Sequence, residues 1–383
     1  MARSAPSFSA FTAGEISPRL EGRTNLEKYS QGLSDLTNMV VMPHGGVTRR
    51  PGTEYLGEVK SSSVKTRLIP FQFKTSDTYI LEFGNQIMRV FRNDLQVLTS
   101  TAKTITAITK ANPGVLTSNS HGFSNGDEVF VDSIGGMTEL NGRNYRVANA
   151  TTNTFTLTDL FGNAMNTTSF TTYTSGGTAT EIYETATPYA EADLFDIRFV
   201  QSADTMYLVH PSYDIRTLTR SDHNNWTFAT LSITGSPSPG LGGANNRPSV
   251  VSFFEQRLVF GNTNNNPQTL WFSKNGDYDN FTTGTGDDDA LVYTIASNQV
   301  NAIRYLSATR VLTVGTSGGE YVLTSTNDSP VTPTTTLIRK YSNYGTATIE
   351  PVQVADVTLF VQRGSRKIRE FKFVGDVNTG GYQ

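Results

Sequence analysis

The sequence of 383 residues contains no cysteine, which excludes disulfide bridges, thiolate metal sites and cysteine nucleophiles. Charged residues are also scarce, at 17%, and the formal net charge is −3. This balance excludes a globally basic nucleic-acid-binding chain and a strongly acidic tail protein. No apolar run approaches the roughly 20 residues that a membrane-spanning helix needs. We therefore expect a chain without a membrane span.

Strand-forming residues take the place of charged ones. Threonine occurs 54 times, and tyrosine and phenylalanine add 16 and 22 residues. Because β-branched and aromatic side chains favour strands, the composition predicts an all-β protein. Only one segment has a helical spacing of apolar residues, with Asn25 as its N-cap. These apolar residues are Leu26, Tyr29, Leu33 and Leu36.

Five β-hairpins recur along the chain, each preceded by a further apolar strand. The last apolar residues before the five turns are Phe83, Val209, Phe260, Val314 and Val361. The first interval between them is 126 residues, and the other three are 51, 54 and 47. A period near 50 residues with three or four strands in each unit is typical of propeller blades, so the sequence predicts a β-propeller. A β-sandwich with coincidental spacing remains the alternative.

The long first interval indicates an inserted domain. Residues 103–183 include a threonine-rich stretch and contain strand patterns at 128–134, 144–148 and 154–157. Subtracting about 80 residues restores the repeat, and lengthening an exposed loop costs little free energy. We therefore expect a small β-barrel domain inserted between two blades. The expected domains are an N-terminal docking segment at 1–60, a first blade at 61–102, the inserted domain at 103–183 and further blades at 184–383.

The end of the chain is unusual for a propeller. Glycine-rich residues 374–383 follow a strong strand pattern directly. A fifth unit without a terminal strand would leave the ring of blades unclosed. We therefore expect the chain to be the N-terminal part of a longer protein.

Motifs that carry enzyme chemistry are weak. The four histidines lack zinc-site spacing, and no phosphate-binding glycine loop is present. The GxSxG pattern at 315–319 lies between two strand patterns, which favours a hairpin turn over a nucleophilic serine. The sequence therefore predicts no enzyme, and no catalytic, cofactor-binding or metal-binding residue.

One acidic patch is dense enough to raise the question of a cation. Its members are Asp277, Asp279, Asp287, Asp288 and Asp289. Their spacing does not fit an EF-hand loop, so a solvated loop is the favoured interpretation and a calcium site is the alternative.

The N-terminal segment carries the most specific motifs. They are FTAGEISPRL at 11–20, YSQG at 29–32, HGGV at 44–47 and RPGT at 50–53. In this order they resemble the opening of the tail tubular protein B family, the nozzle or stabilisation proteins of short-tailed phages (podoviruses). The family opens on a glycine-rich GGxS element, where this chain has Gly14 and Glu15, and it closes on an RPG or RPP motif.

Later motifs extend the resemblance over roughly 1–100 and 184–383. They are FFEQRLVFG at 253–261, WFSK at 271–274, SNQVNAI at 297–303 and GEYVLT at 319–324. Within the insertion, HGFSNGDEVF at 121–130 and LNGRNYRV at 140–147 resemble small phage-tail barrels related to a half-domain of ubiquitin-activating enzymes. No catalysis is carried over to the insertion, because the chain has no cysteine.

The resemblance implies a structural virion protein without a cofactor. Six copies, each with a propeller, would form the lower tail tube. This homohexamer would dock on the adaptor ring below the portal, contact tail fibres and conduct DNA during genome ejection. The implied location is the virion tail, and the host cytoplasm during assembly. The residues that the resemblance marks as candidates for the assembly interface are Arg23, Tyr29, Asn38, Arg50, Pro51 and Gly52.

Two further functions remain as alternatives. One is a host-glycan-binding tail protein, in which loop tyrosines and tryptophans stack on sugars. The other is a propeller-fold polysaccharide hydrolase that uses Asp287 or Asp288. For the nozzle we expect a lumen that is not strongly basic, since a basic lining would hold the DNA. We also expect the insertion to be an outward decoration that touches fibres.

Overall fold

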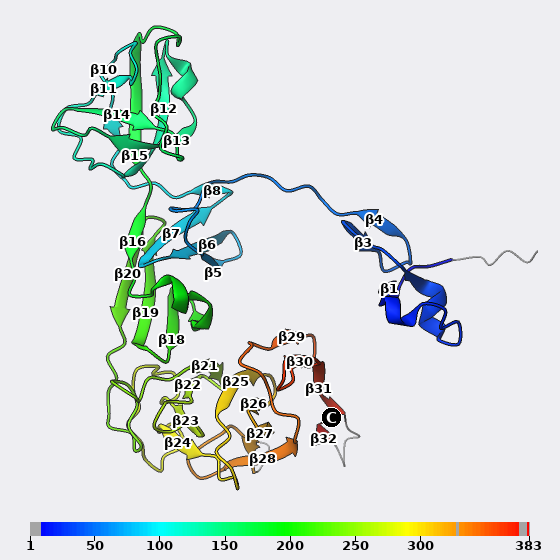
Figure 1. Cartoon of the computed structure of the whole chain (residues 1–383). Helices are drawn as coiled ribbons and strands as arrows, with labels where there is room; N and C mark the ends of the chain where they lie inside the picture. The colour runs from blue at the N-terminus through cyan, green and yellow to red at the C-terminus, as the bar shows by residue number, and fades with distance from the viewer. Residues whose placement is uncertain (1–8, 327–328, 375–380, 383) are drawn as a thin grey trace, which may run out of the picture. The chain divides into compact units, whose positions relative to one another are not determined.

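The computed structural model describes residues 9–326, 329–374 and 381–382. It divides into two compact units, Met1–Leu56 and Gly57–Gln383 (Figure 1). The described residues form strands and short 3-10 helices but no α-helix, which confirms the all-β prediction. None of their helices has both the length and the apolar character to cross a membrane.

The N-terminal unit is a small assembly of short elements. Strands β1 (Gly14–Glu15) and β2 (Gly32–Leu33) pair in parallel, and β3 (Met39–Val41) and β4 (Val47–Arg49) form a hairpin. Two 3-10 helices, η1 (Pro18–Leu20) and η2 (Glu27–Gln31), lie between β1 and β2.

The prediction of a helix capped by Asn25 was wrong. Only the five residues of η2 are helical, Leu26 takes the cap position, and the chain is extended from Gly32. Glycine is a poor helix former. At this position a Cβ atom would also lie 2.5 Å from Cγ2 of Ile16, so a larger residue would force that side chain to move.

The described residues of the second unit form one five-stranded and four four-stranded antiparallel sheets, which are the blades of a β-propeller. Blade 1 contains β5 (Arg67–Lys74), β6 (Asp77–Gly84), β7 (Ile87–Arg92) and β16 (Glu184–Ala186), and β8 (Leu95–Gln96) pairs with β7. Blade 2 contains β17 (Arg198–Ser202), β18 (Thr205–His210), β19 (Tyr213–Asp222) and β20 (Asn225–Thr230). Blade 3 contains β21 (Val250–Phe254), β22 (Arg257–Gly261), β23 (Thr269–Phe272) and β24 (Leu291–Thr294).

Blades 4 and 5 repeat the same strand order. Blade 4 contains β25 (Ile303–Ala308), β26 (Leu312–Thr316), β27 (Gly319–Ser325) and β28 (Thr336–Ser342). Blade 5 contains β29 (Val352–Val354), β30 (Val357–Val361), β31 (Ile368–Val374) and β32 (Gly381–Tyr382). The period of about 50 residues is thus one blade, as the sequence predicts.

The fifth blade differs from the expectation of a missing terminal strand. The two residues of β32 pair with the end of β31. The expected continuation of the protein beyond this chain rests on residues 374–383, of which 375–380 and 383 lie outside the described residues.

The insertion forms a seven-stranded sheet of its own, in the order β10-β11-β14-β13-β12-β15-β9. Its strands are β9 (Lys103–Thr104), β10 (Ala107–Ile108), β11 (Val115–Thr117), β12 (Glu128–Gly135), β13 (Arg143–Ala148), β14 (Thr154–Thr158) and β15 (Ser175–Glu181). The expected position between two blades needs correction. Strand β16, which follows the insertion, pairs with β7, so the insertion interrupts blade 1 before its fourth strand.

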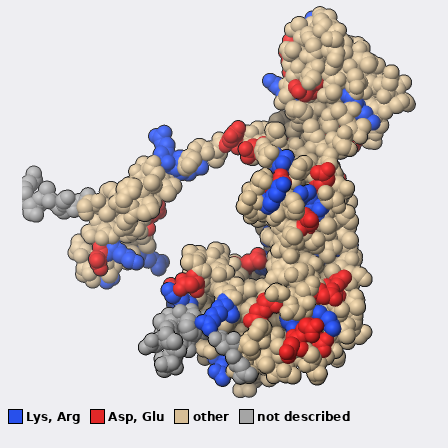
Figure 2. All heavy atoms as spheres, turned by 180° about the vertical axis from the view of Figure 1, so that it is seen from behind, with Lys and Arg blue, Asp and Glu red and all other residues tan. Residues whose placement is uncertain are grey.

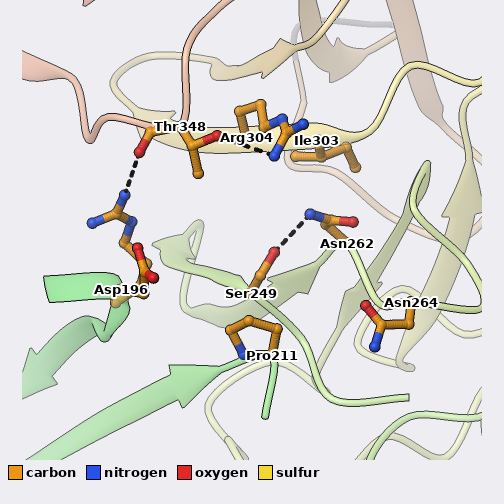
Figure 3. A pocket seen from close by; sticks show the side chains of 9 residues that line it. Asp196, Pro211, Ser249, Asn262, Asn264, Ile303, Arg304 and Thr348 are labelled. Atoms are coloured by element: carbon orange, nitrogen blue, oxygen red, sulfur yellow. Dashed lines mark hydrogen bonds between the residues drawn. The ribbon is translucent and has the colours of Figure 1, made fainter. Parts of the chain in front are cut away.

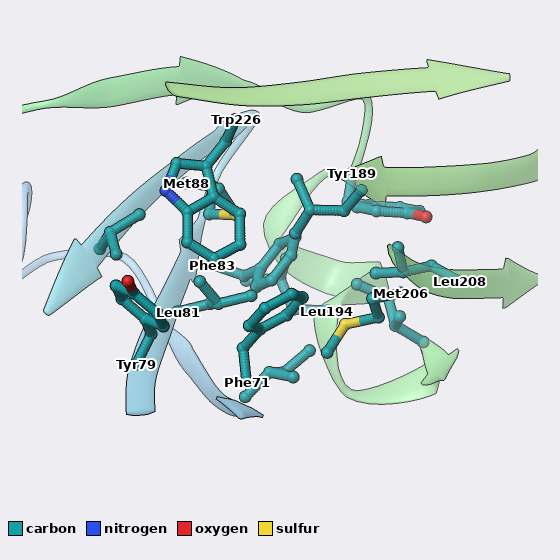
Figure 4. Packing of buried hydrophobic residues seen from close by; sticks show 14 residues of the cluster. Phe71, Tyr79, Leu81, Phe83, Met88, Tyr189, Leu194, Met206, Leu208 and Trp226 are labelled. Carbon is teal, nitrogen blue, oxygen red and sulfur yellow. The ribbon is translucent and has the colours of Figure 1, made fainter. Parts of the chain in front are cut away.

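Apolar side chains from neighbouring blades meet in separate clusters. Figure 4 shows the cluster between blades 1 and 2. The ring centroid of Trp226 lies 4.8 Å from that of Phe71 and 5.4 Å from that of Tyr79. Adjacent residues of a strand point to opposite faces: Phe260 packs toward blade 2, while Val259 packs toward blade 4. Each central strand is therefore apolar on both faces, which explains its continuous apolar run.

Candidate functional site

The candidate assembly residues lie in two places of the N-terminal unit. In the first, Nε of Arg50 donates to Oδ1 of Asn38 at 2.8 Å, and the Arg50 amide donates to the Asn38 carbonyl at 3.0 Å. Asn38 has a positive φ of 57°, a conformation that asparagine tolerates better than most residues. These bonds close the base of the β3–β4 hairpin, and the exposed Pro51 and Gly52 follow directly.

The second place is the loop between η1 and η2. Oη of Tyr29 accepts a bond from the Gly22 amide at 3.1 Å, and Nε of Arg23 donates to Oδ1 of Asn25 at 3.1 Å. Arg23 is exposed, and Tyr29 is partly exposed. These bonds fix the shape of the loop without burying its charged side chains.

The N-terminal unit has almost no core. Among its described residues only Gly45 is buried. Met39 and Val40, on β3, keep 47% and 45% of their area exposed. A folded surface that leaves apolar side chains uncovered is typical of an interaction site.

A buried arginine, Arg257, donates hydrogen bonds to backbone carbonyls of the acidic patch. Nη1 of Arg257 donates to the carbonyl of Asp289 at 2.6 Å and to that of Ser273 at 2.8 Å. Lys274 pairs with the Asp289 carboxylate at 2.8 Å and holds the pKa of that group below its usual value. Across the described residues there is no group of three acidic or histidine side chains that could hold a metal ion. The geometry fits a structural loop.

The GxSxG pattern forms the turn between β26 and β27. Gly315 is the next-to-last residue of β26, Ser317 lies in the turn, and Gly319 is the first residue of β27. Gly315 is required by packing, because a Cβ there would lie 2.1 Å from the ring of Tyr305. The strand-to-helix geometry of a nucleophilic serine is not present at this turn.

A polar recess that the sequence did not reveal lies at the starts of the first strands of the blades. Its volume is about 270 Å³. Figure 3 shows Thr348 and Arg304 on one side and Ser249 and Asn262 on another. The lining residues are Asp196, Arg198, Pro211, Ser249, Asn262, Asn264, Ile303, Arg304 and Thr348. They come from four successive blades or the segments that enter them.

Two arginines of the recess converge on Thr348. Nη2 of Arg198 donates to the Thr348 carbonyl at 3.2 Å, and Nη1 of Arg304 donates to the Thr348 hydroxyl at 3.1 Å. Arg198 also pairs with Glu350, but at 3.6 Å. Burial lowers the pKa of Arg67; of the charges near it, Glu350 raises this pKa and Arg198 lowers it. The recess therefore gathers guanidinium groups.

Buried ion pairs join the insertion to blade 1. Nη2 of Arg89, on β7, lies 2.8 Å from Glu128 on β12 and 2.6 Å from Glu184 on β16. The side chains of Arg89 and Glu128 are 0% and 1% exposed. Arg146 also pairs with Glu128 at 3.1 Å, and Lys60 with Glu184 at 2.9 Å. Such a junction gives a fixed orientation only while each charge keeps its partners.

One family model matches part of the chain. Residues 112–183 match the model described as "Ubiquitin-activating enzyme E1 FCCH domain". The match covers most of the insertion and none of the propeller strands. No curated protein matches the chain.

Solved structures similar to the chain share little sequence with it. A phage phi92 endosialidase is 14% identical with a TM-score of 0.32, over 78% of this chain and 53% of the other. The chain thus spans about half the length of that protein. The beta-propeller domain of Cps50 (Swd1) from Myceliophteria thermophila is 11% identical with a TM-score of 0.32, over 80% and 86% of the two chains. Propellers are therefore among the structures to which this chain is similar.

Proposed function

We propose that the chain is a structural virion protein that forms the distal tail tube, or nozzle, of a short-tailed bacteriophage. In this role six copies form a ring, which docks on the tail adaptor and conducts DNA during ejection. The observation that carries the proposal is the N-terminal unit. The motifs that resemble the family's opening lie in a separate compact unit, where Gly45 is the one buried residue among those described.

The propeller suits a rigid tube wall. Its strands are paired within blades, and neighbouring blades bury apolar faces between them. Paired strands leave few free edges for uncontrolled association, so lateral contacts can be made by side chains. Identical contacts repeated around an axis close into a ring when the rotation allows.

The surface charge agrees with a passage for DNA. Figure 2 shows Lys and Arg interspersed with Asp and Glu on the face in view, among many uncharged residues. A strongly basic lining would bind the phosphate backbone and slow its passage. In this proposal the protein contacts DNA without reading its sequence, and it catalyses no reaction.

Negative-stain electron microscopy with light scattering tests the proposal. The purified chain is expected to form six-fold rings with an axial hole. Replacement of Asn38 and Arg50 by alanine is expected to abolish the rings. The matched control is Lys28→Ala, an exposed charge in the same unit. A persistent monomer, or rings that survive the double replacement, would contradict the proposal.

A further inference from the structure

The recess at the starts of the inner strands has the features of a ligand site. Two arginines line it from different blades: Arg198 is the first residue of β17, and Arg304 is the second of β25. Strand β21 contacts both β17 and β25, so these starts lie together. The fold therefore brings two guanidinium groups to one end of the blades.

The lining of the recess carries more positive than negative charge. Its charged residues are Arg198, Arg304 and Asp196, and Glu350 pairs with Arg198 at 3.6 Å. Within the described part of the chain, Arg304 has no carboxylate at ion-pair distance. Arg304 donates a hydrogen bond to the Thr348 hydroxyl. A guanidinium has five N–H donors, so most donors of Arg304 remain available to a ligand.

The arginines are held rather than mobile. The Arg198 side chain is only 12% exposed and is bound to the carbonyl of Thr348. Arg304 is bound to the hydroxyl of the same residue. A planar guanidinium fixed in this way is suited to bidentate recognition of a carboxylate or phosphate.

The remaining lining is suited to hydroxyl groups. The amide of Asn264 makes no hydrogen bond within the described residues, and Asn262 donates to Oγ of Ser249 at 2.7 Å, which leaves the Ser249 proton free. Pro211 adds an apolar wall. Small-molecule pockets usually have about 300–1,000 Å³. A recess of about 270 Å³ therefore suits one sugar ring rather than a longer chain.

From these contacts we propose that the recess binds a single sugar ring that carries a carboxylate. Arg304 and Arg198 hold the carboxylate, and the amides of Asn264 and Asn262 hold ring hydroxyls. Phosphate shares the charge but not the hydroxyl pattern, and it binds more weakly. All the residues that line the recess belong to one chain.

Binding to the full chain by calorimetry and ligand-observed NMR tests the proposal. The probes are sodium glucuronate, its neutral counterpart methyl glucoside, and inorganic phosphate. Glucuronate is expected to bind saturably. Methyl glucoside and phosphate are expected to bind at least about tenfold more weakly. Absence of saturable glucuronate binding, or equal binding of phosphate or methyl glucoside, would overturn the proposal.

Variants locate the bound probe. Arg304→Gln is expected to weaken glucuronate about tenfold or more, with an unchanged melting temperature. Asn264→Ala removes no side-chain hydrogen bond to the residues that the structure describes. It is expected to weaken glucuronate binding several-fold and serves if Arg304→Gln fails to fold. The control is Arg363→Gln, an exposed arginine outside the recess. Binding that is equal in the wild type and both recess variants would place the probe elsewhere and overturn the proposal.

Discussion

The two units of this chain are stabilised in different ways. The unit Gly57–Gln383 buries apolar clusters between successive blades and inside its insertion. The unit Met1–Leu56 has one buried residue among those described, and hydrogen bonds such as that between Arg50 and Asn38 define its form. Since burial of apolar area is the main source of stability, the first unit is expected to depend on a partner.

This contrast separates residues that maintain the fold from residues that maintain contacts. Replacements in the propeller should lower the free energy of unfolding of the isolated chain. Replacements in the N-terminal unit should leave that free energy nearly unchanged and should affect assembly instead. The predictions below test this division, from the largest expected effect to the smallest.

The largest effect is expected at the junction between the insertion and blade 1. Arg89→Met removes the buried partner of Glu128 and leaves a carboxylate without its closest charge. Breaking one side of a buried pair typically costs about 3–5 kcal/mol. Chemical denaturation of the two proteins measures the difference. Arg50→Met, an exposed arginine of the other unit, is the control, and an equal effect of the two replacements would contradict the division.

A smaller loss is expected at the turn between β26 and β27. Gly315→Ala would place a Cβ 2.1 Å from the buried ring of Tyr305, and such overpacking costs about 1–3 kcal/mol. Ser317→Ala in the same turn should change stability by less than about 0.5 kcal/mol. Thermal unfolding of both variants checks this pair. A larger loss from Ser317→Ala than from Gly315→Ala would show that the turn is not shaped by packing.

The smallest effect in the propeller is a dependence on pH. Burial raises the pKa of Glu320 above the value of 4.5 usual for the unfolded chain. The folded protein therefore holds this proton more tightly, so its contribution favours folding at low pH and is lost as pH rises through the folded pKa. Glu320→Gln keeps the shape and an oxygen for the Ser342 hydroxyl.

The glutamine variant is expected to gain stability relative to the wild type as pH rises from 4.5 to neutral. Melting curves of both proteins across this range measure the difference, in which the other titrating groups cancel. Parallel curves with a constant offset would mean that Glu320 does not titrate differently in the folded state.

The sequence predicts the propeller because its signals are local. Each hairpin, such as that of β6 and β7, places apolar residues and turn residues within about 20 positions. The position of the insertion within blade 1 depends on a contact between residues far apart in the sequence. Strand β16 has three residues, and its pairing with β7 spans the whole inserted domain, so no short pattern marks it.

The candidate sites show the same limit. The motif residues Asn38 and Arg50 are close in sequence and lie together in the structure. Arg198 and Arg304 are far apart in sequence, and only alignment of the blade starts would have placed them together. The apolar spacing near Leu26 predicts a longer helix than the structure has, because this spacing does not show how closely Ile16 approaches the extended Gly32.

The most direct test of the division between fold and assembly is removal of residues 1–56. Calorimetric unfolding and light scattering are measured on the full chain and on the variant that begins at Gly57. The account predicts the same melting temperature for the propeller and a complete loss of rings. A melting temperature lower by several degrees, or rings that form without the N-terminal unit, would contradict it.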